Sequence, residues 1–299
     1  MLDTLLSVGD RAREHALRLV RAQWSALGAD VDADLEASAA IDPEALVLAS
    51  LGLVDRDRSL AMVLSWWAGE GPGLLSVQRM RNLAPSYPDR VRYRLGEFAG
   101  YAWKIGGDHR WKSLARAPRS LPAVDGGPSP RLDGPGVLLR LRLGLGVGIK
   151  ADLVAVLLGL GGWHTVRAVT EATGYTGRAV RRAAADLVRG GWIEVLPAGP
   201  SEYRAPSDRW LPLLDLDGPP SWRHWHDRLA FVLAVDGWLR GEGPDGSSEP
   251  PEVARALVEA HPTAFKWAGV AVPGGEGAAY LGSWVDAVTE LADGLAASA

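Results

Sequence analysis

The sequence contains no cysteine, and its 299 residues include only four lysines against 28 arginines. Without cysteine there can be no disulfides, thiolate zinc sites or thiol catalysis, and this absence is typical of cytoplasmic proteins. Residues 1–10 lack a cationic segment followed by an apolar one, so no secretory signal is expected. The longest apolar stretch, residues 138–160, is interrupted by Arg140, Arg142, Lys150 and Asp152. We therefore predict that the protein does not cross a membrane.

Recognisable catalytic and metal-binding patterns are also missing. Residues 144–150 are rich in glycine and end in lysine, but they lack the spacing and the hydroxyl of a phosphate-binding loop. His224 and His226 stand two positions apart on a predicted helix, so their side chains point apart and cannot share a metal ion. We expect no enzymatic activity, no cofactor and no metal site.

The net charge of −4 averages three regions of different character. Residues 1–130 carry no net charge, residues 131–209 carry +4, and residues 210–299 carry −8. A positive middle region suits a polyanionic partner. The acidic C-terminal region suits dimerisation, a protein partner or the sensing of a small molecule.

Helical periodicity and proline-rich stretches divide the chain into four parts. We predict a helical N-terminal domain (1–116), a linker rich in proline and glycine (117–136), a middle domain (137–209) and an acidic, tryptophan-rich helical C-terminal domain (210–299). The predicted helices of the flanks are residues 1–28, 43–54, 57–69, 76–84, 88–105, 221–240, 251–260, 263–270 and 278–295.

The clearest local pattern lies in residues 149–203. A helix over 150–160, a second over 166–173 and a third over 176–189 are followed by strands at 192–196 and 202–204, with a turn between the strands. Thr176 is the expected N-cap of the third helix. The helical period places apolar and basic residues of this helix on opposite flanks. The apolar flank contains Val180, Ala183, Ala184 and Leu187, and the basic flank contains Arg178, Arg181, Arg182 and Arg189. Arginines in this arrangement suit guanine edges and phosphates in the major groove of DNA.

The segment TVRAVTEATGYTGRAVRRAAADLVRGGWIEVLP and the order of its elements resemble the winged helix-turn-helix regulators of the MarR-like, ArsR-like and GntR-like families. The resemblance covers about residues 149–206. It implies a positioning helix over 166–173, a recognition helix over 176–189, and a wing contact from Arg204 to the DNA backbone or minor groove. Tyr175 and Thr176 would reach bases or phosphates, and Arg167 would bind the backbone.

We therefore predict a mainly α fold, with a central winged helix-turn-helix and a small β-wing flanked by two helical domains. The predicted function is a cytoplasmic transcriptional regulator, a repressor, that binds double-stranded DNA as a homodimer without a cofactor. The alternative is a non-catalytic interaction protein, antitoxin-like or defence-associated, whose winged domain is a docking or dimerisation scaffold. In either case, the C-terminal domain could bind a protein partner or a small-molecule effector.

A second basic region could extend the DNA footprint. Its side chains are Arg79, Arg81, Arg90, Arg92, Arg94, Lys104, Arg110, Lys112, Arg116 and Arg119. The alternatives are intramolecular pairing with the acidic first part of the chain and an ordinary solvated face.

Overall fold

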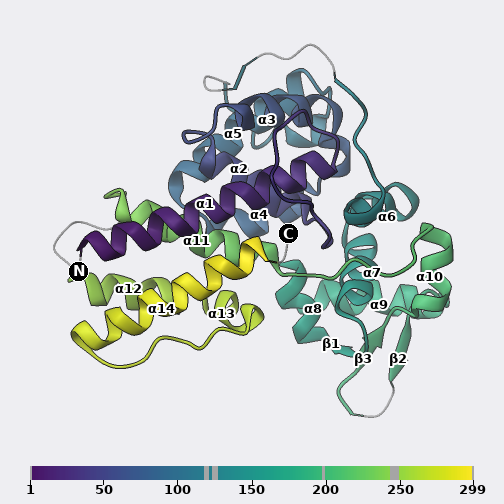
Figure 1. The fold of residues 1–299 in the computed structure, drawn as a ribbon. Helices are drawn as coiled ribbons and strands as arrows, with labels where there is room; N and C mark the ends of the chain where they lie inside the picture. Colours follow the sequence, from purple (N-terminus) through teal and green to yellow (C-terminus); the bar gives the residue numbers. More distant parts are fainter. Residues whose placement is uncertain (1, 118–120, 123–126, 197–198, 243–248, 298–299) are drawn as a thin grey trace.

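A computed structural model describes residues 2–117, 121–122, 127–196, 199–242 and 249–297 (Figure 1). The first part of the chain forms α1 (Leu2–Ala26), α2 (Pro43–Leu53), α3 (Ser59–Glu70), α4 (Val77–Leu83) and α5 (Asp89–Lys104). Short 3-10 helices are η1 (Pro72–Leu74), η2 (Ala84–Ser86), η3 (His109–Trp111) and η4 (Gly134–Gly136). The middle part contains α6 (Val137–Leu145), α7 (Ile149–Leu160), β1 (His164–Thr165), α8 (Val166–Thr173), α9 (Gly177–Arg189), β2 (Glu194–Leu196), β3 (Glu202–Arg204) and α10 (Ser207–Leu214). The last part contains α11 (Trp225–Leu239), α12 (Pro250–Ala260), α13 (Pro262–Ala268) and α14 (Gly277–Ala296).

Several helix starts follow directly from capping residues. The Asp42 side chain accepts a hydrogen bond from the Ala45 amide at the start of α2, and the Ser76 side chain caps α4 in the same way. Helix α10 was not predicted, because residues 206–220 read as a domain boundary and Pro212 lies inside the helix. Parts of the predicted linker (118–120 and 123–126) and of the predicted turn (197–198) lie outside the described residues.

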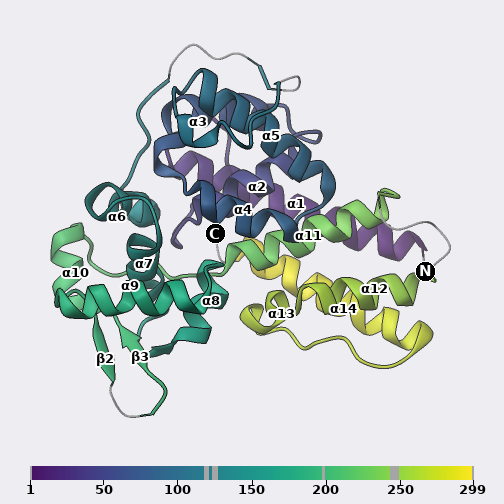
Figure 2. The same ribbon diagram turned by 180° about the vertical axis from the view of Figure 1, so that it is seen from behind.

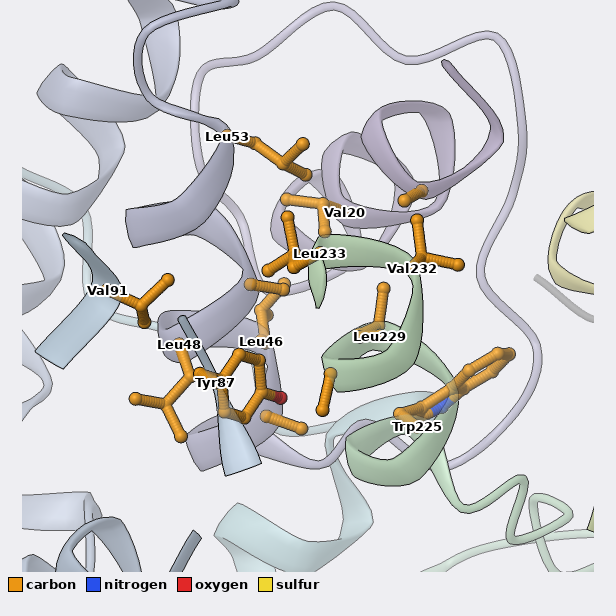
Figure 3. Packing of buried hydrophobic residues seen from close by; sticks show 14 of the residues in the cluster. Val20, Leu46, Leu48, Leu53, Tyr87, Val91, Trp225, Leu229, Val232 and Leu233 are labelled. Carbon is orange, nitrogen blue, oxygen red and sulfur yellow. The ribbon is translucent and has the colours of Figure 1, made fainter. Parts of the chain in front are cut away.

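The two ends of the chain share one hydrophobic core. Helix α1 packs along α14 and α11, and α11 packs against α2. Figure 3 shows Leu233 of α11 beside Val20 of α1 and Leu46 of α2, and Leu229 and Val232 belong to the same buried cluster. We call this unit, residues 2–116 and 225–297, the helical body. The predicted separation into two flanking domains is therefore corrected. The reason lies in α11, which is apolar around most of its circumference and must be covered on several sides.

The middle of the chain forms a second core, and we call residues 137–222 the central unit. Its sheet has the order β1-β3-β2, and both strand pairs are antiparallel. Tyr203 of β3 lies opposite His164 of β1 and Val195 of β2. Helix α7 packs against α6, α8 and α9, and its residues from Ala151 to Leu158 are buried. The short sheet contacts α7 through β3 and α8 through β1 (Figures 1 and 2).

A buried ionic network joins the central unit to the helical body. Asp42 and Glu44 of the body, Arg79 of α4, Arg142 of α6 and Asp152 of α7 are each at most 1% exposed. Arg79 donates to Asp42 Oδ2 and to Glu44 Oε2, both at 2.6 Å. Arg142 donates to Glu44 Oε1 at 2.6 Å and to Asp152 Oδ1 at 2.8 Å. Burial alone would raise the pKa of Asp42 and of Glu44, but the guanidinium groups outweigh it and hold both pKa values below their ordinary range.

A second junction forms around His224, the residue before α11. Its ring stacks on Trp267 with centroids 3.8 Å apart. Nearby, Lys266 of α13 bridges to Glu171 of α8 at 2.6 Å. Neither ring nitrogen of His224 has a hydrogen-bond partner among the described residues. Burial lowers the pKa of His224 to about 3, so the ring is neutral in the folded protein.

Replacing Arg142 with alanine should lower the free energy of unfolding by about 3–5 kcal/mol, because Glu44 and Asp152 would stay buried without their partner. The control is Arg11→Ala, which removes an exposed ion pair with Asp293 and should cost about 0–1 kcal/mol. Urea unfolding followed by circular dichroism measures both. Equal, small losses in the two variants would contradict the structural role of the network.

Unfolding should become easier as the pH falls from about 6.5 toward 5. Burial lowers the pKa of His224 to about 3 and that of His226 and His261 to about 4. In the unfolded chain, these three histidines bind protons near pH 6.5. The stability that the folded state gains from keeping them neutral is therefore complete above that pH and is lost progressively below it. Asp227 acts in the opposite direction. Burial raises its pKa to about 6, so as the pH falls the folded state binds this proton at a higher pH than the unfolded chain does.

The net difference is about two protons, which corresponds to roughly 3 kcal/mol per pH unit near pH 5. Urea unfolding at about pH 7.5 and about pH 5 measures this dependence. An unchanged free energy of unfolding would show that these side chains titrate normally.

Candidate nucleic-acid interface

Helix α9 presents the basic flank that the sequence predicts. Val180, Ala183, Ala184 and Leu187 are buried against the central unit. The Thr176 hydroxyl oxygen accepts a hydrogen bond from the Ala179 amide at 3.3 Å, which confirms the predicted N-cap. Figure 2 shows α9 on the near side of the molecule, beside the β2–β3 hairpin. The exposed side chains of its outer flank are Arg178, Arg181, Arg182 and Arg189.

These four arginines are free to bind a ligand. In the part of the chain that the structure describes, none of them has a salt bridge or a side-chain hydrogen bond. Asp186, the single acid of α9, pairs with Lys150 of α7 at 3.0 Å. The interaction with Lys150 lowers the pKa of Asp186 and keeps its charge. Arg189 and Arg182 also lie within electrostatic reach of Asp186, but its ion pair is with Lys150 and not with an arginine of the outer flank.

A groove of about 580 Å³ lies between this flank and the β-hairpin. Arg181 of α9 and Arg167 of α8 line it from the helices, and Ser201 lines it from the hairpin. The full lining is Thr165, Val166, Arg167, Arg181, Gly199, Pro200, Ser201 and Tyr203. Its two guanidinium groups and three hydroxyls are suitable donors to phosphate oxygens.

Arg167 is a strongly exposed cation at the groove. Its side chain is 87% exposed, and it donates to Glu171 Oε1 at 2.9 Å. Glu171 also accepts from Lys266, so one carboxylate faces two cations. The positive charge at the entrance of the groove is therefore only partly neutralised.

Arg204 has several partners within the sheet region. Its guanidinium donates to Glu194 Oε2 and lies over the Trp163 ring, 4.7 Å from the centroid. Arg209 of α10 donates to the other oxygen of the same carboxylate at 3.2 Å. Trp163 and Arg209 were not singled out from the sequence, because only the folded sheet brings them beside Arg204.

Tyr175 does not belong to the exposed surface, which corrects the prediction that it reaches DNA. Its ring is buried, and its hydroxyl donates to Asp152 Oδ2 at 2.9 Å within the ionic network. Burial, followed by the negative charge of Asp152, raises the pKa of this hydroxyl well above its ordinary value. Tyr175 precedes α9 and anchors it, while Thr176 is the first exposed residue.

The second basic region mostly pairs within the protein. Arg79 belongs to the ionic network, Arg94 pairs with Asp55 at 2.6 Å, and Arg90 pairs with Asp236 at 3.0 Å. Arg92 and Arg110 pair with Asp89 and Asp108. Pairing with the acidic first part of the chain therefore holds for Arg79 and Arg94, whereas Arg90 pairs with the C-terminal part and Arg92 and Arg110 pair with nearby aspartates. Arg119 lies outside the described residues. Within those residues, no carboxylate pairs with the four other cations, which are Arg81, Lys104, Lys112 and Arg116.

The tryptophans of the last third of the chain serve mainly in packing. Trp210, Trp222, Trp225 and Trp284 are buried, and Trp238 packs edge-on against Trp284. A pocket of about 330 Å³ instead lies beside Trp66 and Met62 of α3. Over the described ranges, no group of three potential ligand residues could hold a metal ion. Nor does any described helix have the length and apolar character needed to cross a membrane.

No known protein family matches this chain, and neither does any curated protein or solved structure. The winged helix-turn-helix resemblance therefore depends on the residues and elements of residues 149–206 themselves.

Replacing Tyr175 with phenylalanine should destabilise the protein by about 1–3 kcal/mol, because Asp152 would lose a buried donor. Binding of any α9 ligand should remain within about twofold of wild type under conditions where the variant is folded. Urea unfolding and a binding titration on the same preparation separate the two effects. A large loss of binding with unchanged stability would instead show that Tyr175 contacts the ligand directly.

Proposed function

We propose that the central unit is a winged helix-turn-helix that binds double-stranded DNA, with α9 in the major groove. The observation that carries the proposal is the outer flank of α9, where four exposed arginines have no carboxylate partner in the described chain. An α-helix fits the major groove of B-DNA, where arginine can donate two hydrogen bonds to one guanine.

The groove beside α9 supports the same arrangement. Its arginines, Arg167 of α8 and Arg181 of α9, both line the space next to the β-hairpin. With α9 in the major groove, this space would receive the adjacent sugar-phosphate backbone. Such contacts fix the register of a protein on DNA without reading its sequence.

The protein would act as a transcriptional repressor that occupies its own upstream DNA as a homodimer. A single α9 would contact only a few base pairs, so two half-sites would be needed for strong and selective binding. In a two-fold complex, the half-sites would lie about one helical turn apart, roughly 10 base pairs from centre to centre.

Arg182→Ala should weaken binding to the upstream duplex by roughly 1–3 kcal/mol, because one bidentate contact to a base is lost. Binding to a scrambled duplex should weaken less. Fluorescence anisotropy over a salt series measures affinity and counterion release together, and each lost phosphate contact lowers the log–log salt slope by about 0.9.

The matched control is Arg11→Ala, which removes one exposed arginine from α1 and should leave DNA binding unchanged. Absence of wild-type binding to either duplex at low salt would refute DNA binding and favour a protein-docking role. Equal wild-type affinity for both duplexes would refute sequence-specific regulation.

A further inference from the structure

Four cations of the helical body form a second positive surface, which we call the basic strip. It consists of Arg81 in α4, Lys104 at the end of α5, Lys112 after η3 and Arg116. All four are exposed, and no carboxylate pairs with them in the described ranges. The neighbouring acids are already engaged, since Asp108 pairs with Arg110 and Asp89 pairs with Arg92. The local positive charge is therefore not cancelled by adjacent ion pairs.

Aromatic rings support the cations of the basic strip. The ammonium groups of Lys104 and Lys112 lie 5.9 and 5.7 Å from the centre of the same Trp103 ring. Arg116 lies over the Tyr93 ring at 5.1 Å, and Tyr93 is 45% exposed. Two ammonium groups near one ring, together with Arg81 and Arg116, raise the local positive potential and attract an anion. A phosphate group is such an anion.

The basic strip begins beside the start of α9. Asn82 of α4 donates to the Gly174 carbonyl oxygen at 3.2 Å, in the turn before α9. The adjacent Arg81 donates to Ser113, which follows Lys112 in the chain. Figure 2 shows α9, α4 and α5 on the near side of the molecule. The basic strip and α9 thus meet where α4 contacts the turn before α9.

We propose that the basic strip binds the sugar-phosphate backbone of the same DNA duplex, beyond the segment in contact with α9. This inference rests on the proposed function of the central unit. Duplex DNA is the favoured partner because the basic strip and α9 meet at the turn before α9. Contacts of this kind add affinity that depends on salt and not on sequence.

The test compares two double variants with the same change of charge. Lys104→Gln with Lys112→Gln removes two cations of the basic strip. Arg56→Gln with Arg58→Gln removes two exposed arginines between α2 and α3 that are not part of the basic strip. Anisotropy is measured over a salt series on a duplex of about 30 base pairs and on one of about 12 base pairs, which is little more than one helical turn.

On the longer duplex, the strip variant should lower the salt slope by about 1.8, which corresponds to roughly 30-fold weaker binding at about 0.15 M salt. The shorter duplex is too short to contact both α9 and the basic strip. On this duplex, the affinity of the strip variant should stay close to that of wild type. The control double variant should match wild type on both duplexes. Similar melting temperatures for the two variants would show that folding is unaffected.

The basic strip is excluded as a DNA contact if its variant keeps the wild-type slope on the longer duplex while Arg182→Ala still weakens binding. That result would leave the proposed function intact. Equal losses in both double variants would also exclude it, because they would indicate a general effect of net charge. If wild type binds neither duplex, the proposed function and the inference fail together, and binding to RNA or to an acidic protein instead would identify another class of partner.

Discussion

The position of the central unit depends on one buried set of charges. Two guanidinium groups and three carboxylates lie out of contact with water, and each charge costs several kcal/mol to bury unless its partners are in place. The remaining carboxylate acceptors are satisfied by other donors, including the Ser76 amide to Glu44 at 2.7 Å and the Tyr175 hydroxyl to Asp152. Few alternative arrangements satisfy all these groups. Because Tyr175 lies directly before α9, the network also fixes the angle of α9 to the helical body.

Internal pairing decides which charges can face a partner. Asp236 of α11 is 2% exposed and accepts from Arg13 and Arg90, and Arg240 also lies within ion-pair distance. Part of the acidic excess of the last ninety residues is thus neutralised inside the helical body, and so are several arginines of residues 74–116. The unpaired arginines of α9 gain significance from this, because the arginine-rich composition alone would make exposed arginines common. Geometry, more than net charge, locates the positive surface.

Local signals in the sequence predicted the elements better than their assembly. Asp42 before Pro43 predicted the start of α2, and Thr176 with the 3.6-residue period predicted α9 and its two flanks. The union of α1 with α11 and α14 could not be predicted, since each helix shows only that it has an apolar surface. The prediction that Tyr175 contacts DNA was wrong for a related reason. It lies in a turn without periodicity, and its partner Asp152 is 23 positions away in the sequence. The basic flank of the candidate site was thus visible in the sequence, whereas its anchor was not.

Because both ends of the chain form the helical body, this body cannot finish folding until the C-terminal helices have been synthesised. Helices α1 to α5 leave the ribosome well before α11, yet Val20 and Leu46 pack against residues of α11. The central unit has its own core and lies between these segments, so it can fold while the first helices remain incomplete. Until α11 and then α14, which ends at Ala296, have emerged, part of the apolar surface of the first helices stays open to other chains. During synthesis, the central unit, which carries the exposed arginines, can therefore be folded before the helical body is complete.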